Sequence, residues 1–126
     1  MNTVLEVTGL TKNFGLCKAL QGVDMSLAAG QIIGLLGPNA SGKTTLLKIA
    51  AGLMPPSAGS ISYYKNAAPG PAARKTIGFC PDTLNYPKWM KVRNAFTFYR
   101  EMYSDYSQDR ANELVRILEL DDIQNM

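Results

Sequence analysis

Residues 37–44 have the composition of a loop that can hold a phosphate group. They read Gly-Pro-Asn-Ala-Ser-Gly-Lys-Thr, which fits the pattern of a glycine, four free positions, a second glycine, a lysine and a hydroxyl residue. Glycines at positions 37 and 42 permit backbone conformations that a side chain would prevent, so successive N–H groups can surround an anion. Lys43 adds positive charge near the β- and γ-phosphates, and the Thr44 hydroxyl is a hard oxygen ligand suited to Mg²⁺. The residues predicted to bind the nucleotide phosphates are Gly37, Pro38, Asn39, Ala40, Ser41, Gly42, Lys43, Thr44 and Thr45.

The segments on both sides of this loop predict the elements that would position it. Residues 31–36 form a short apolar run that indicates a strand, and residues 45–51 have the pattern of a helix that Gly52 is placed to end. Strand, loop and helix in this order suit phosphate binding, because the helix directs the positive end of its dipole at the anion. The alternative is a glycine-rich turn that matches the pattern by chance, and the flanking segments argue against it.

Length, charge and hydropathy exclude several classes of protein. A chain of 126 residues indicates one domain. The formal net charge is only +3 and the basic residues are scattered, so the sequence predicts no nucleic-acid partner. No apolar run reaches the roughly 18 residues of a membrane span, and the N-terminus lacks the pattern of a secretory signal. We therefore expect a cytoplasmic protein.

Cysteine and histidine usage narrows the chemistry further. Cys17 and Cys80 fit no metal or redox spacing, and in a cytosolic protein two reduced thiols are favoured over a single disulfide. The chain contains no histidine, which excludes histidine acid–base catalysis and histidine metal sites. The site must therefore rely on phosphate electrostatics, Mg²⁺ and carboxylates.

The predicted secondary structure of the rest of the chain changes after about residue 82, from strands and loops to helices. Alternating apolar residues predict strands at 4–7, 18–27, 61–64 and 75–80, with a turn at 13–15 and a surface loop at 65–71. Apolar residues at helical spacing then predict amphipathic helices over 92–103 and 111–118, the second capped by Ser107 or Asp105. Mixed strands and helices make this an α/β chain.

Three further segments lie at distances from the phosphate loop that match those in a known protein family. They are residues 14–20, with an aromatic, a glycine and an alanine-leucine pair, residues 53–61 after the first helix, and residues 77–82. Together with the loop, these segments resemble the N-terminal half of the ATP-binding subunit of an ABC transporter, and the resemblance covers essentially the whole chain. Residues 86–90 and 98–106 most resemble bacterial exporters of the antibiotic-resistance kind.

This resemblance implies a fold and a function. The fold would be an α/β P-loop NTPase (RecA-like) core with an N-terminal antiparallel β subdomain over 1–82. The start of a helical subdomain would follow over 83–126, giving a single truncated domain over 1–126. The protein would bind Mg-ATP at the inner face of the cell membrane and pair head-to-tail with a second ATP-binding subunit. Its hydrolysis of ATP would drive transmembrane subunits, in the direction of export.

The resemblance also implies roles for individual residues. Lys43 would stabilise the transferring phosphoryl group. Phe14 would stack on the adenine, although composition alone fits a core residue equally well. Asp82 stands where the family usually has a glutamine that reaches Mg²⁺; a carboxylate is also a hard ligand, and the alternative is an ordinary surface turn. The aromatic and methionine residues of the segment 86–106 predict a core between packed helices. The alternative is that part of this segment lines the groove in which a membrane subunit docks.

Several elements of the family's ATPase are absent from the sequence. It has no LSGGQ-like signature, no Asp-Glu pair after four apolar residues and no switch histidine. We therefore expect little or no turnover by this chain alone, and an unpaired inner edge beside residues 31–36. A non-catalytic nucleotide-binding or transporter-docking fragment is the alternative. A GTPase or small-molecule kinase is a third reading, disfavoured because the guanine-reading Asn-Lys-x-Asp pattern is missing.

Overall fold

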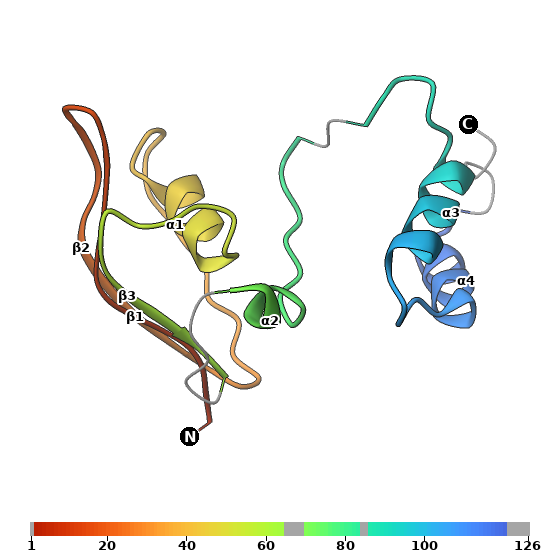
Figure 1. The fold of residues 1–126 in the computed structure, drawn as a ribbon, viewed down its shortest axis with the longest axis horizontal. Coiled ribbons are helices and arrows are strands. Elements are labelled where there is room, and N and C mark those ends of the chain that lie inside the picture. Colours follow the sequence, from red (N-terminus) through yellow and green to blue (C-terminus); the bar gives the residue numbers. More distant parts are fainter. Residues whose placement is uncertain (1, 65–69, 84–85, 121–126) are drawn as a thin grey trace. The chain divides into compact units, whose positions relative to one another are not determined.

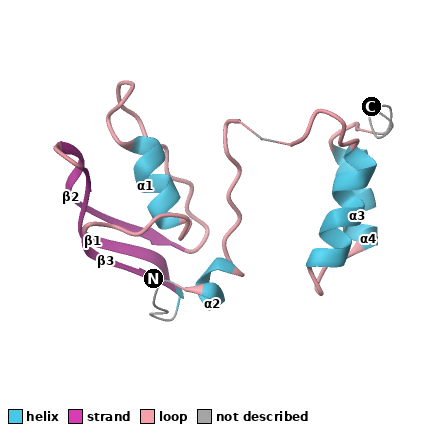
Figure 2. Ribbon diagram, turned by 45° about the horizontal axis from the view of Figure 1, so that its top comes forward, coloured by secondary structure: helices cyan, strands magenta, loops and turns pink. Residues whose placement is uncertain are grey.

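The computed structural model describes residues 2–64, 70–83 and 86–120 and contains two compact units that divide between Cys80 and Pro81. In the described part of the first unit, three strands form one sheet, with helix α1 between β2 and β3 in the chain and helix α2 after β3 (Figure 1). The regular secondary structure described in the second unit is helical, with loops before and between its helices (Figure 2). The phosphate-binding sequence lies entirely within the first unit.

The sheet of the first unit is antiparallel, with strand order β2-β1-β3. Its strands are β1 (Thr3–Phe14), β2 (Cys17–Ala28) and β3 (Ala58–Tyr63). The strands predicted at 4–7, 18–27 and 61–64 are confirmed, and β1 is three times longer than the alternation indicated. The extra length arises because β1 pairs with a neighbour on each side, so its polar residues also gain ladder hydrogen bonds.

A bulge bends β1 near its middle. The register of β1 with β2 and with β3 shifts around Gly9, and the Gly9 N–H donates to the Asp24 carboxylate over 2.7 Å. A bulge increases the local twist of the sheet, so the concave face can follow the surface of a packed helix.

Helix α1 (Lys43–Ala50) packs on that sheet (Figure 1). Leu46 and Ile49 lie three residues apart on one helix face and are 4% and 1% exposed. Their buried partners from the sheet are Val7, Leu10, Leu20, Ile61 and Tyr63. The helix ends as predicted at Gly52, whose N–H donates to the Ile49 carbonyl over 2.9 Å. Burial of this apolar face holds the phosphate loop's helix in place.

Tyr63 is the one member of this core with a polar atom, and its hydroxyl is buried without a hydrogen-bond partner among the described residues. Replacing Tyr63 with phenylalanine should raise the free energy of unfolding by about 1 kcal/mol, because an unsatisfied buried donor is removed at nearly constant volume. Urea unfolding followed by circular dichroism measures this. A destabilised variant would show that the hydroxyl is satisfied in solution.

The same residue gives a pH dependence that the variant should lose. Desolvation by burial raises the pKa of the Tyr63 phenol above its ordinary value of 10.0. Because the unfolded chain then releases this proton more readily than the folded chain, stability falls as the pH rises above about 10. The phenylalanine variant should show a shallower loss of stability over the same alkaline range.

Two predicted strands are wrong. Residues 31–36 are not a strand, and no backbone hydrogen bond joins residues 32–36 to another described residue. Residues 75–80 continue as turn and irregular chain after the short helix α2 (Pro71–Arg74). An apolar run becomes a strand only when a neighbour supplies the ladder, and the described chain places none beside either segment. The predicted loop at 65–71 lies largely outside the described residues.

The exposed apolar segment 31–36 predicts self-association. Ile32 is fully exposed beside unpaired backbone groups, so a second copy can add its own segment as a strand. Replacing Ile32 with lysine should shift the protein toward monomer in sedimentation velocity, because charges at a strand edge oppose pairing. Leu16 is equally exposed but lies in the β1–β2 turn, so Leu16→Lys is the matched control. Equal effects of the two lysines would point to general solubility instead.

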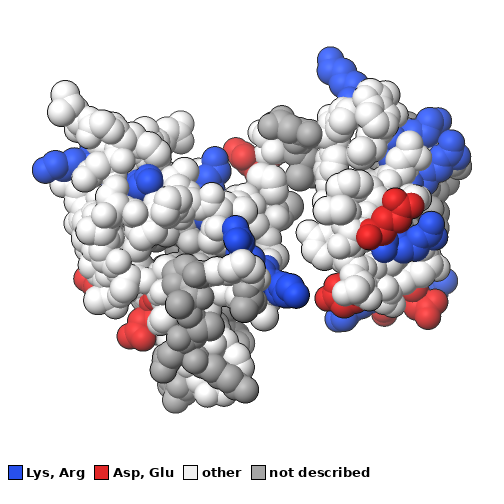
Figure 3. All heavy atoms as spheres, in the orientation of Figure 1, with Lys and Arg blue, Asp and Glu red and all other residues white. Residues whose placement is uncertain are grey.

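The second unit contains helices α3 (Val92–Met102) and α4 (Gln108–Ile117), which confirms the two predicted helices. Ser107 caps α4 by accepting a hydrogen bond from the Arg110 N–H over 3.3 Å. Ala111 and Val115 form the buried stripe of α4. Over the face of this unit seen in Figure 3, positive and negative side chains are interspersed.

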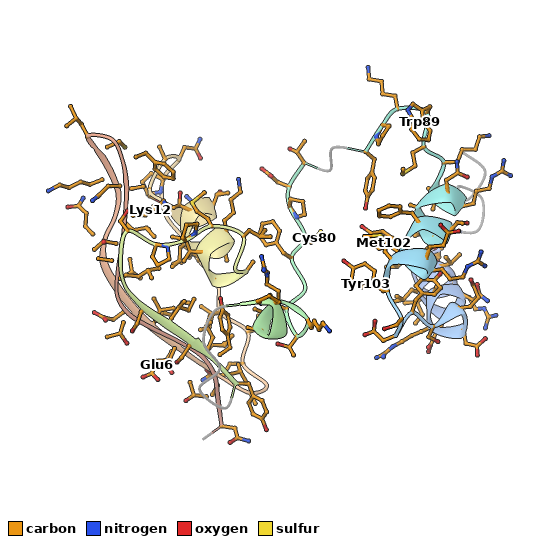
Figure 4. The ribbon with its side chains drawn as sticks, in the orientation of Figure 1. Glu6, Lys12, Cys80, Trp89, Met102 and Tyr103 are labelled. Carbon is orange, nitrogen blue, oxygen red and sulfur yellow. The ribbon has the colours of Figure 1, made fainter. Side chains whose placement is uncertain are left out.

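The interpretation of residues 86–106 as helix-packing core is wrong for most of its aromatic side chains. Helix α3 has no buried residue, and most of the large side chains of this segment are one third to three quarters exposed, whereas Met90, Phe96 and Tyr106 are half-buried. They include Trp89, Met102 and Tyr103, labelled in Figure 4, together with Tyr86, Phe98 and Tyr99. The helical spacing is correct, but within the second unit most of these side chains stay exposed.

Two further sequence expectations bear on the surface. Cys17 and Cys80 are both exposed, and no disulfide joins them. Among the residues that the structure describes, no helix has the length and apolar content needed to cross a bilayer.

Candidate functional site

The phosphate loop of residues 37–42 is a compact turn in front of α1. Ala40 and Gly42 adopt left-handed backbone conformations with φ of 63° and 90°. The Ser41 N–H donates to the Pro38 carbonyl over 3.3 Å, and the Leu46 N–H donates to the Gly42 carbonyl over 2.9 Å. Helix α1 begins at Lys43, directly after Gly42, so the N–H groups of its first turn, which have no partner within a helix, follow the loop in the chain.

Position 42 needs a glycine because the backbone of β2 passes next to it. A Cβ atom at this position would lie 2.4 Å from the Ala19 carbonyl oxygen and 2.9 Å from the Leu20 Cδ2. At Gly37, a Cβ would lie 2.9 Å from the Ser41 Oγ. The atom near Gly37 is a side-chain hydroxyl that can rotate away, whereas the atom nearest Gly42 belongs to the backbone, so the close approach of the loop to β2 depends on Gly42.

The Lys43 side chain folds back over this loop. Its ammonium group donates to the carbonyl oxygens of Gly37 and Pro38 over 2.7 and 2.5 Å, and to the Ser41 Oγ over 3.2 Å. A lysine ammonium has three N–H donors, and these three acceptors use them all. A bound phosphate must therefore take over at least one of these positions, with the ammonium already at the rim of the loop.

A cleft of about 390 Å³ lies along the loop. One wall is formed by residues 39–45, and the other by Cys17, Lys18 and Ala19 at the start of β2. Thr44 and Thr45 both line it, and the Thr44 side chain is exposed. Of the residues predicted to bind phosphate, all but Gly37 and Pro38 line this cleft, and Lys43 joins those two to it by hydrogen bonds.

The predicted metal ligands are not gathered into a protein-only site. Within the described ranges, no three side chains of His, Cys, Asp or Glu come close enough to hold an ion. The donors present fit Mg²⁺ only if phosphate oxygens complete its shell, with Thr44 as the protein ligand. Asp82 is exposed and belongs to the second unit, so its role in metal binding stays a prediction.

Phe14 lies at the end of β1, where it pairs with Cys17 across the hairpin. Its ring is 49% exposed, so the core alternative does not hold for this residue. Phe14 is therefore the cross-strand neighbour of Cys17, which lines the cleft on the side opposite the phosphate loop. An exposed aromatic face in this position can stack on a flat base.

Sequence reasoning missed the wall that β2 contributes. Cys17, Lys18 and Ala19 fall in the 14–20 segment that carries the family resemblance, but the sequence did not predict their contact with the loop, which the packing of β2 against Gly42 creates. The one local signal is the requirement for glycine at position 42, which indicates a close neighbour without identifying it.

Comparisons with known proteins agree with this geometry. The ABC transporter family profile matches residues 20–126. The chain is 37% identical over 102 residues to the ribose import ATP-binding protein RbsA of Pseudomonas putida, which covers 78% of this chain and 20% of that protein. It is 35% identical over 121 residues to the sulfate/thiosulfate import ATP-binding protein CysA of Mesostigma viride, which covers 95% of this chain and 35% of that protein. The chain thus spans about a third or less of these relatives.

Solved structures show the same fold. The ATP-binding subunit of an ABC transporter superposes with a TM-score of 0.79 at 24% identity, covering 96% of this chain and 52% of that structure. A dimeric ATP-binding cassette in a post-hydrolysis state with ADP and Pi gives a TM-score of 0.74 at 22% identity, covering 91% of this chain and 57% of that structure. By its family profile, its relatives and its α/β P-loop fold, this chain belongs to the ABC transporter family, as part of an ATP-binding cassette.

Proposed function

We propose that this chain binds Mg-ATP in the cleft beside residues 37–45 and acts as the ATP-binding component of an ABC transporter. The observation that carries the proposal is the position of the Lys43 ammonium, held at the rim of the loop by three oxygen acceptors. Its charge and the loop amides would bind the β- and γ-phosphates, which carry most of the negative charge of ATP.

The other parts of the site have separate roles in this proposal. The Thr44 hydroxyl would bind Mg²⁺ together with phosphate oxygens, and Asp82 would approach the same ion. Phe14 would stack on the adenine from the hairpin end. Catalysis would consist of electrostatic stabilisation of the transferring phosphoryl group, led by Lys43.

The partners follow from the family. We propose that the chain works at the inner face of the membrane with transmembrane subunits and a second ATP-binding subunit. The names of RbsA and CysA describe import, of ribose and of sulfate or thiosulfate. These relatives give the export interpretation no support, and the proposal is therefore limited to energising transport. The exposed aromatic face of α3 would be available to a membrane subunit.

Binding without hydrolysis is the second candidate function. The sequence favours it because the chain has no Asp-Glu pair after four apolar residues and no histidine, so it supplies neither the general base nor the switch residue. Phosphate release by purified, monodisperse protein separates the two candidates. Release that Lys43→Ala abolishes would support an ATPase, and its absence with intact Mg-ATP affinity would support a binding module.

Titration calorimetry tests the proposal directly. We expect Mg-ATP to bind more tightly than ATP in the presence of EDTA, because the metal neutralises phosphate charge and adds the Thr44 contact. Competition between ATP and GTP tests the alternative of a GTPase, which the sequence disfavours because it has no guanine-specific pattern. Folded protein without affinity for Mg-ATP would refute the proposed function.

A further inference from the structure

Lys12 lies beside the aromatic ring that the proposed function assigns to the adenine. Its Nζ is 5.2 Å from the centroid of the Phe14 ring, over the ring face. The two residues are two positions apart on β1, so their side chains leave the strand on the same face. A lysine at this distance over an aromatic face is a cation–π pair (Lys12 is labelled in Figure 4).

A second contact fixes the position of this ammonium group. The Lys12 Nζ donates to the Pro55 carbonyl over 2.8 Å. The segment that contains Pro55 is itself tied to β1, because the Ser57 N–H donates to the Thr11 carbonyl over 2.9 Å and the Asn13 N–H donates to the Ser57 Oγ over 3.0 Å. The two hydrogen bonds of Ser57 involve the residues just before and just after Lys12 on β1. They hold the segment that contains Pro55 against β1, so the bond to the Pro55 carbonyl keeps the Lys12 ammonium group in place.

We propose that Lys12 is a positioning residue for nucleotide binding, which rests on the proposed function. Its ammonium covers one face of Phe14, so the ring can offer only its opposite face to a purine base. A half-exposed ring at the end of a hairpin otherwise samples several rotamers. Holding it in one orientation before the ligand arrives lowers the entropy lost on binding. Lys12 thereby strengthens the binding of the adenine base, whereas Lys43 binds the triphosphate.

Comparing two ligands tests this division in the full chain. Mg-ATP carries the base, whereas magnesium tripolyphosphate offers a similar phosphate tail without one. Lys12→Met keeps an unbranched side chain but removes the charge, and should weaken Mg-ATP binding about two- to fivefold, the range of an exposed cation–π pair. Affinity for magnesium tripolyphosphate should stay unchanged in the same calorimetric titrations.

Lys12→Arg is the conservative variant. A guanidinium group also stacks on an aromatic face and donates to a carbonyl, so this variant should retain the wild-type affinity for Mg-ATP. Lys18 lies on the same hairpin and lines the phosphate cleft. Lys18→Met is therefore the contrasting variant, expected to weaken both ligands by the same factor because only charge is lost. Urea unfolding of each variant confirms that the compared proteins are folded.

The Phe14→Leu background completes the test. Loss of base stacking should itself weaken Mg-ATP binding about tenfold, and adding Lys12→Met should then cause no further loss. Equal weakening of both ligands by Lys12→Met, or the same loss in the Phe14→Leu background, would overturn the inference. So would wild-type affinity in Lys12→Met. If the wild type binds neither ligand, the proposed function fails and this inference fails with it, whereas the other outcomes leave the proposed function standing.

Discussion

Replacing Lys43 with alanine should weaken Mg-ATP binding by about tenfold to more than a hundredfold. The ammonium group is already held at the loop by the carbonyls of Gly37 and Pro38, so little reorganisation is needed for it to reach a phosphate. Each charge-assisted hydrogen bond that is lost is worth about 1.5–3 kcal/mol. That free energy corresponds to the stated range of affinity. Titration calorimetry on the folded variant measures it.

Lys48 provides the matched control for this experiment. It lies in the last turn of the same helix, is exposed, and does not line the cleft beside the loop. Lys48→Ala removes the same charge from α1 and should change Mg-ATP affinity less than twofold, because solvent and salt screen a distant surface charge. Equal losses in the two variants would mean that net charge controls binding, and the site assignment at Lys43 would be wrong.

Adding one methyl group at Gly42 should have the largest effect on the fold of the loop. The new Cβ would lie 2.4 Å from the Ala19 carbonyl oxygen, a backbone atom that cannot move without shifting β2. The residue also has a φ of 90°, where an L-amino acid is strained. We expect the free energy of unfolding to fall by about 3 kcal/mol, and Mg-ATP affinity to fall below detection, as the two walls of the cleft move apart.

Circular dichroism is the appropriate probe for this variant. The chain has a single tryptophan, Trp89, which lies in the second unit, so intrinsic tryptophan fluorescence reports on the wrong part of the molecule. Gly34→Ala is the control, because a Cβ at Gly34 meets no atom within 4 Å. It should leave stability within about 0.5 kcal/mol of the wild type. A tolerated Gly42→Ala would show that β2 does not form the second wall in solution.

Together, these variants separate two functions of the loop residues. In the proposed site Lys43 acts on the ligand, so its loss should mainly reduce affinity, with only a small loss of stability because its hydrogen bonds to the loop are exposed to solvent. Gly42 acts through the contact between the loop and β2, so its loss should reduce both quantities. The combined pattern distinguishes a chemical contribution to binding from a packing contribution.

The helices that the structure confirms depend on local interactions, whereas the confirmed strands β1, β2 and β3 are held by pairing across the sheet. The α1 face, with Leu46 and Ile49 three residues apart, and the Gly52 stop are encoded within a few neighbouring residues. The α3 and α4 helices are read from the same periodicity. The phosphate loop is local too, because glycine, lysine and threonine at fixed spacing determine which groups can face an anion.

The incorrect predictions all involve partners distant in sequence. Apolar runs at 31–36 and 75–80 look like strands, but strand formation needs a neighbour, and the described chain supplies none to either. The aromatic residues of α3 follow helical spacing, yet spacing does not reveal whether another layer covers them. Burial and ladder pairing are properties of the assembled chain.

The sequence by itself determined the chemistry available to the proposed site: a loop of backbone amides, one ammonium group and a hydroxyl group, on a helix with one apolar face. The tertiary structure alone decided the second wall of the cleft, where Cys17 to Ala19 meet the loop, and the placement of Lys12 over Phe14. The spacing of residues in a motif determines only which residues become neighbours within one or two turns of the backbone. Contacts between β2 and the loop depend instead on strand register, which is set by the packing of the sheet against α1.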